Sequence, residues 1–205
     1  MRPTTRRISV AGPVGRIECA IDVPLSAAHA VALIAHPHPL YGGTLDNKVV
    51  QTLARTFVDL GYVALRPNFR GVGASEGEHD GGAGEVDDLA SVLNHGRQEY
   101  GAAPVVLAGF SFGAAIQVRL AQRLAAAEVE RLVLVGLAVT RRDTPAVPKG
   151  TLVIHGELDE TVPLAAVLDW ARPQDQPVIV LPGADHFFHR RLQVLRDIVR
   201  HAWGA

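Results

Sequence analysis

The stretch "VVLAGFSFGAAIQVRLAQRL", residues 105–124, changes character at its centre. Its first six residues are apolar, as in a strand covered on both faces, and its second half has an Ala-rich helical pattern. Ser111 stands at the junction, inside the pattern G-x-S-x-G that runs from Gly109 to Gly113. A sharp strand-to-helix turn lifts a serine hydroxyl clear of the backbone and directs a helix N-terminus at it. The junction predicts an α/β fold with Ser111 as a nucleophile.

A second G-x-S-x-G match, "GASEG" at 73–77, lacks this setting. The loop around it, "FRGVGASEGEHDGGAGE", contains six glycines, which disfavour a helix, and Glu76 and Glu78 close to Ser75 would repel an oxyanion. The loop also spaces its glycines wrongly for a dinucleotide fingerprint. We therefore expect Ser75 to shape a glycine-rich active-site loop rather than to act as the nucleophile.

Outward from residues 105–124, apolar runs alternate with helical patterns. Helices are predicted over 45–60, 85–101, 111–127 and 190–203. Strand–helix alternation indicates βαβ units, and hence one mostly parallel sheet with helices on both faces. Residues 17–23 instead alternate apolar and polar side chains after the turn "GPVG", which indicates an antiparallel hairpin at the sheet edge. We expect a single α/β domain over residues 1–205. The predicted strands are "VALIA" (31–35), "YVAL" (62–65), "VVLAGF" (105–110), "LVLVGLAV" (132–139), "TLVIH" (151–155) and "VIVL" (178–181).

Composition narrows the class of protein. The net charge is −1 and there is no basic tract, so nucleic acid is not an expected partner. The N-terminal residues lack the apolar core of a signal peptide, and the longest apolar run is far shorter than a membrane span. The single cysteine, Cys19, is expected to be a buried thiol and is compatible with a reducing compartment. We expect a soluble, cytoplasmic protein without a membrane partner.

A serine nucleophile needs a histidine base, and the histidine needs a carboxylate. His186, in "LPGADHFFH", follows the last predicted strand, where catalytic groups gather in parallel sheets. Asp159, in "HGELDETVP", follows the preceding strand and is the expected acid. Asp143 is an alternative, because some hydrolases place the acid after the earlier strand. Asp185 adjoins His186, but side chains of neighbouring loop residues usually diverge.

The order Ser111, Asp159, His186 is the one used by α/β-hydrolases. The motifs "HPHP…GG", "RGVGASEG", "GFSFG", "HGELDETVP" and "GADHFF" also fall in the order of that superfamily. Over nearly its whole length the chain resembles α/β-hydrolases, most closely the small bacterial serine hydrolases without a lid that carry an H-P-H-P loop. These motifs are highly specific for the fold and weakly specific for the substrate.

The resemblance implies an oxyanion hole. The N–H of Phe112, after the nucleophile, is one expected donor. The superfamily pattern H-G-x-P aligns with residues 36–39 and selects the N–H of His38, although Pro37 replaces the family's glycine and has no N–H. The same H-x-H stretch does not continue into a hydrolytic metal pattern, so no metal and no organic cofactor are expected.

The sequence therefore predicts a serine hydrolase that cleaves small esters through an acyl-enzyme. Perhydrolysis, or hydrolysis of a C–C bond, amide or thioester, is an alternative on the same fold, and so is a non-catalytic small-molecule binder. Only residues 140–150, with two prolines, separate two predicted strands where caps are usually inserted, so no cap domain is expected. The acyl site should then be walled by loops, with Leu40, Tyr41 and Phe187 binding the substrate beside Phe112.

Overall fold

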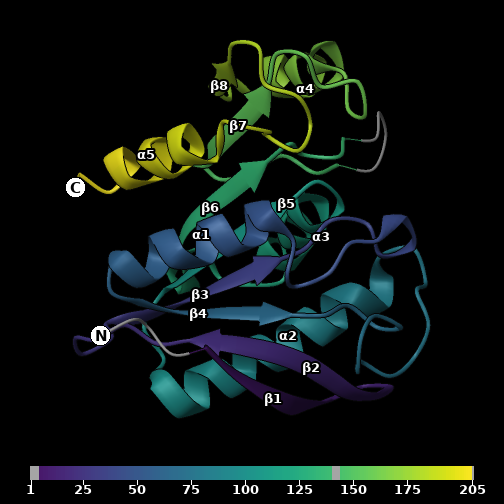
Figure 1. The fold of residues 1–205 in the computed structure, drawn as a ribbon, viewed down its shortest axis with the longest axis vertical. Coiled ribbons are helices and arrows are strands. Elements are labelled where there is room, and N and C mark those ends of the chain that lie inside the picture. Colours follow the sequence, from purple (N-terminus) through teal and green to yellow (C-terminus); the bar gives the residue numbers. More distant parts are fainter. Residues whose placement is uncertain (1–4, 140–143, 205) are drawn as a thin grey trace.

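The computed structural model describes residues 5–139 and 144–204. Over these residues the chain forms one eight-stranded sheet in the order β1-β2-β4-β3-β5-β6-β7-β8, with helices on both faces (Figure 1). The strands are β1 Thr5–Gly12, β2 Gly15–Asp22, β3 Ala30–Ala35, β4 Tyr62–Pro67, β5 Val105–Phe110, β6 Val129–Val135, β7 Leu152–Gly156 and β8 Val178–Leu181. The α-helices are α1 Lys48–Asp59, α2 Ala83–Tyr100, α3 Phe112–Ala121, α4 Leu164–Ala171 and α5 Leu192–Ala202, and short 3₁₀ turns lie at Pro39–Tyr41, Ala126–Glu128 and Arg172–Gln174.

The predicted edge hairpin is confirmed. β1 pairs antiparallel with β2, and β2 pairs antiparallel with β4, whereas β4, β3, β5, β6, β7 and β8 are mutually parallel. Cys19 on β2 is fully buried, and burial raises the pKa of its thiol to about 12. The thiol is therefore a protonated core group at neutral pH.

The central strands are apolar throughout because each of their faces is covered. On β3, Val31, Leu33 and Ala35 belong to the core beneath α2 and α3, whereas Ala32 and Ile34 belong to the core beneath α1 and α5. This is the two-residue alternation of a strand, with apolar side chains required on both sides. Figure 1 shows α1 and α5 together on one face of the sheet.

The order of the strands fixes where a site can form. The chain passes from β3 to β4 on one side and then returns across β3 to β5 on the other. Right-handed crossovers consequently place α1 and α2 on opposite faces, and the loops that follow β3 and β5 separate at their carboxyl ends. Ligands of open parallel sheets bind in this crevice.

Two elements, β6 and α3, end well before the residues that the sequence predicts. β6 ends at Val135 rather than Val139, because Gly136, whose N–H still bonds the carbonyl of Ile154 on β7, adopts φ 53° and turns the chain out of the sheet. The helix predicted over 111–127 ends at Ala121. In the described part of the chain, no helix combines the length and the apolar character needed to cross a bilayer.

Candidate active site

Ser111 occupies a strained turn between β5 and α3. Its φ of 56° and ψ of −119° lie in a region that residues with a side chain rarely adopt. The flanking glycines are required by close backbone contacts: a Cβ at Gly109 would lie 2.5 Å from the carbonyl oxygen of Gly113, and a Cβ at Gly113 would lie 2.4 Å from that of His36. The turn therefore has the geometry of a nucleophile elbow.

The structure brings the three residues of the predicted triad together from three loops. His186 Nε2 lies 3.0 Å from Ser111 Oγ, and His186 Nδ1 lies 2.6 Å from Asp159 Oδ2. The three residues follow β5, β7 and β8, whose carboxyl ends meet at one edge of the sheet, and each is at most 7% exposed. In this arrangement the imidazole can accept the serine proton while its Nδ1–H donates to the carboxylate.

Asp159 is oriented by its own loop. Its Oδ1 accepts the backbone N–H of Thr161 at 3.0 Å and that of Val162 at 2.7 Å, which leaves Oδ2 for His186. His155 Nε2 donates to the carbonyl of Val162 at 2.8 Å and lies 3.3 Å from Oδ2 of Asp159. Burial lowers the pKa of His155, so this ring is a neutral support beneath the carboxylate. Because a histidine at the end of an apolar strand indicates only a core group, the sequence alone gives no signal of this support.

The competing residues have other partners. Ser75 Oγ donates to the carbonyl of Asn68 at 2.8 Å and accepts the N–H of Glu18 at 2.9 Å, so it ties the glycine-rich loop to β2. Asp185 accepts from His189 Nδ1 at 2.6 Å. Asp143, the alternative acid, lies outside the described residues.

His36 anchors the loop that carries the second predicted oxyanion donor. Its Nε2 accepts the N–H of Phe69 at 2.9 Å, and its Nδ1 lies 2.6 Å from the carbonyl of Pro37. Both ring nitrogens are thereby used, which makes His36 a structural group. The turn is tight, since a Cβ at Gly43 would lie 2.0 Å from that same carbonyl oxygen. Within the described part of the chain, the N–H groups of His38 and Phe112 have no hydrogen-bond acceptor, and the two rings are 4.8 Å apart.

His36 should make stability depend on pH. Burial lowers its pKa to about 4, whereas an unfolded histidine titrates near pH ~6.5. The unfolded chain therefore takes up a proton in this window while the folded chain does not, so the stabilisation present above pH ~6.5 is lost as the pH falls toward ~4. We expect the free energy of unfolding in urea to be about 2 kcal/mol lower at pH 5 than at pH 7.

A His36→Gln variant supplies the control, because glutamine can bond both partners without titrating. Its free energy of unfolding should vary less between pH 7 and pH 5, with the remaining slope including the lowered pKa of His155. An equal slope in the two proteins would contradict the assignment to His36. Carboxylates with lowered pKa values, such as Glu18, take up protons mainly below about pH 5, so they contribute little to the difference between pH 7 and pH 5.

A cavity of about 430 Å³ opens beside Ser111. One face of α3 forms part of its wall, the loops after β3, β4, β6 and β7 and the start of α4 contribute the other lining residues, and Tyr41 and Phe112 are among them. Leu40 and Phe187 are 71% and 47% exposed and are not among the described residues that line it. Because β6 ends before Gly136, Ala138 and Val139 lie in the wall of the cavity. The sequence places these two residues in the predicted strand and therefore does not identify them as lining residues.

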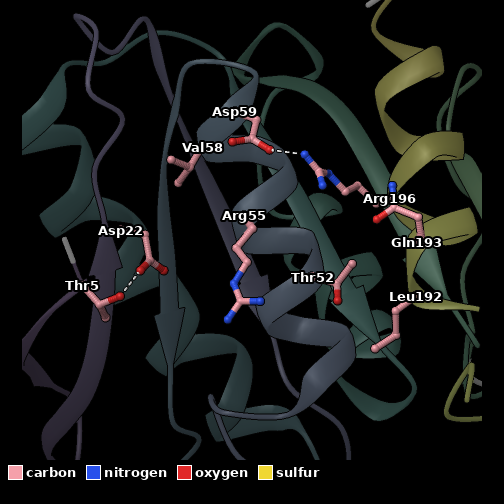
Figure 2. A pocket seen from close by; sticks show the side chains of 9 residues that line it. All are labelled: Thr5, Asp22, Thr52, Arg55, Val58, Asp59, Leu192, Gln193 and Arg196. Atoms are coloured by element: carbon pink, nitrogen blue, oxygen red, sulfur yellow. Dashed lines mark hydrogen bonds and ion pairs between the residues drawn. The ribbon is translucent and has the colours of Figure 1, made fainter. Parts of the chain in front are cut away.

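A second cavity, of about 690 Å³, lies among β1, β2, α1 and α5. Figure 2 shows Asp59 joined to Arg196 on one side of α1 and Thr5 joined to Asp22 on the other. Asp22 also accepts from Arg66 at 2.9 Å. These acids already have partners, and among the described residues this cavity shares no lining residue with the cavity at Ser111. No group of three or more His, Cys, Asp or Glu side chains within residues 5–139 and 144–204 is arranged to hold a metal ion.

Known proteins resemble this chain in sequence and in structure. The family described as serine aminopeptidase, S33 (Hydrolase_4) matches residues 40–194. An α/β serine hydrolase homologue from Coxiella burnetii is 38% identical, with a TM-score of 0.89 over 98% of both chains. An α/β serine hydrolase without a lid from Xanthomonas campestris is 36% identical, with a TM-score of 0.88 over 98% of this chain and 94% of the other. An uncharacterised protein of Rickettsia prowazekii is 46% identical over 113 residues, which are 55% of this chain and 48% of that protein, so the match spans about half of the relative's length.

The family match covers most of the chain, and the structural matches cover nearly all of it. The resemblance extends through the strained turn at Ser111 and through the loops that carry Asp159 and His186. The chain therefore belongs to the serine aminopeptidase S33 (Hydrolase_4) family of the α/β-hydrolase superfamily and is a hydrolase.

Proposed function

We propose that this chain is a carboxylesterase that cleaves small esters through an acyl-enzyme on Ser111. The observation that carries the proposal is the continuous hydrogen-bond chain from Ser111 through His186 to Asp159 at a strained turn. Such a chain activates a hydroxyl that is otherwise a weak nucleophile. A protein that only binds its ligand would have no use for all three groups.

The proposed reaction has two halves. Ser111 Oγ attacks the ester carbonyl carbon while its proton passes to His186 Nε2, and the N–H groups of Phe112 and His38 stabilise the oxyanion. His186 then gives this proton to the leaving alcohol oxygen as the C–O bond breaks. Water attacks the acyl-enzyme with the same histidine as base, which releases the acid and restores Ser111. Asp159 keeps the Nδ1–H tautomer throughout.

An ester fits the cavity better than a peptide N-terminus, although the family takes its description from an aminopeptidase. An aminopeptidase must hold the protonated α-amino group of its substrate, for which a carboxylate is the usual partner. Among the described residues that line the cavity there is no Asp or Glu. The volume of about 430 Å³ also lies at the small end of the range for small-molecule sites.

The test compares p-nitrophenyl esters of increasing acyl length with aminoacyl p-nitroanilides. Within this neutral series of esters we expect kcat/KM to be highest for the short acyl groups and to be lost in Ser111→Ala, and we expect no rise in rate at the solubility limit. Faster turnover of the anilides would favour the aminopeptidase. A steep increase at the onset of aggregation would show that some segment serves as a lid.

A further inference from the structure

One unpaired cation lies in the cavity beside Ser111. Arg119 is partly buried, lines this cavity, and has no hydrogen bond or ion pair among the described residues. It is also the only described lining residue with a permanent charge. Its neighbour one turn further along, Arg123, is paired with Asp87 across to α2. A half-buried arginine at a substrate cavity, with no partner in the described part of the chain, is available to a substrate anion.

The carboxylates near Arg119 are committed to other groups. Its Nη1 lies beside the backbone of Gly82, since a Cβ at Gly82 would be 2.6 Å from it. Asp80 accepts from Gly84 N at 2.9 Å and from Arg70 at 3.2 Å. Glu85 accepts from Gly82 N at 2.8 Å and lies 2.6 Å from His79 Nδ1. The α2 N-terminus and Arg70 thus engage the acids of this loop, and the guanidinium of Arg119 faces a residue without a side chain.

Ser111 and Arg119 lie along the same face of α3. The lining residues of this helix are Phe112, Ala115, Ile116 and Arg119, which share one face at helical spacing. Arg119 follows Ser111 by eight residues, which corresponds to about 12 Å along a helix axis. Helical side chains lean toward the N-terminus, so the guanidinium reaches back toward the serine. Ser111 and Arg119 therefore line the same cavity about two helical turns apart, and the residues of α3 between them that line it, Phe112, Ala115 and Ile116, are apolar.

The acyl part of the substrate, rather than the alcohol, is the part that enters this cavity. His186 must touch the leaving oxygen in order to protonate it, so the alcohol departs on the side of His186. His186 is not among the described residues that line the cavity, whereas Ser111 and Phe112 are. A neutral chain long enough to reach Arg119 would desolvate the guanidinium without pairing it, which is unfavourable.

We propose that Arg119 selects esters whose acyl group carries an anionic terminus, with a carboxylate as the fitting group, several methylenes from the reacting carbonyl. This inference rests on the proposed esterase function and specifies the substrate class of the same site. A guanidinium binds a carboxylate with two parallel hydrogen bonds, so Lys at this position should be a poorer substitute.

The experiment uses mono-p-nitrophenyl esters of adipic, pimelic, suberic and azelaic acid, each beside the same ester with a terminal carboxamide. The measured quantity is the ratio of kcat/KM for the carboxylate to that for the carboxamide. In the wild type we expect a ratio of about 10 or more at the best length. Arg119→Gln should reduce this ratio about tenfold or more through KM, Arg119→Lys should retain part of it, and the matched control Arg123→Gln should retain it in full.

The other outcomes separate this inference from the proposed function. Ester hydrolysis with a ratio near one in both the wild type and Arg119→Gln would overturn the anion inference without contradicting the proposed esterase function.

If none of these esters is cleaved, the proposed function fails, and calorimetric titration of Ser111→Ala with suberate then tests the anion site alone. Binding that is lost in Ser111→Ala/Arg119→Gln would support the site, and absence of binding to Ser111→Ala would overturn it. An ester with its carboxylate on the phenol should not depend on Arg119.

Discussion

Ser111→Ala is expected to lower kcat/KM for ester hydrolysis by about 10⁵–10⁶-fold while the fold is retained. Without the hydroxyl no acyl-enzyme can form, and only the oxyanion donors and the cavity still assist attack by water. The substitution to alanine removes no hydrogen bond that the fold needs, because Ser111 Oγ bonds only His186 among the described residues. The measurement is kcat/KM with a short p-nitrophenyl ester, together with the urea-unfolding midpoint.

The matched control is the serine of the other G-x-S-x-G match. Ser75→Ala should keep most activity but lower the free energy of unfolding by about 1–3 kcal/mol, because its buried hydroxyl joins Asn68 and Glu18. His186→Ala should be about as inactive as Ser111→Ala, and the double variant should be little worse than either, because the groups act as a unit. An active Ser111→Ala enzyme, or additive losses in the double variant, would contradict this mechanism.

Asp159→Asn is expected to lower kcat by about 10⁴-fold. Oδ1 of Asp159 accepts two backbone N–H groups, so the asparagine oxygen should keep that position and its NH₂ should take the place of Oδ2. The amide would then donate to Nδ1 of His186, which forces the proton onto Nε2. A histidine protonated at Nε2 cannot accept the proton of Ser111.

Asp143→Asn is the matched control for the acid, because Asp143 is the alternative carboxylate of the sequence. It should keep nearly full activity, measured with the same ester at the same pH. If Asp159→Asn stayed active while Asp143→Asn lost activity, the acid would come from the segment after β6.

Much of the fold could be predicted from local pattern. The runs at β3 and β5 could be recognised because strands covered on both faces must be apolar at nearly every position, and β5 is predicted to the residue. The run at β8 is also predicted, although β8 is an edge strand on which Ile179 is exposed. The alternation of apolar and polar residues on β2 identified the edge hairpin, because such alternation is typical of an antiparallel strand with one face on the core and the other toward solvent. The position of Ser111 followed from the strand-to-helix junction at its G-x-S-x-G pattern, and those of Asp159 and His186 from the rule that functional groups gather at the carboxyl ends of parallel strands.

The remainder depends on tertiary contacts that a sequence does not display. The end of β6 is set by the positive φ of Gly136, although the apolar run continues to Val139. The sequence does not predict α4, because this helix has only eight residues and they are almost uniformly apolar, which gives weak helical periodicity. The support that His155 gives to Asp159 and the exposure of Arg119 to the cavity arise from packing between separate loops.

Labelling the wild-type protein with a fluorophosphonate and mapping the modified peptide tests directly whether Ser111 is the activated nucleophile. Such a probe reacts with a serine only where a base activates the hydroxyl and donors stabilise the phosphoryl oxygen. We expect one labelled peptide, carrying the modification on Ser111, with labelling abolished in His186→Ala and retained in Ser75→Ala. Label on Ser75, or no label on Ser111 in folded protein, would show that the hydrogen-bonded chain from Ser111 to Asp159 is not the catalytic machinery.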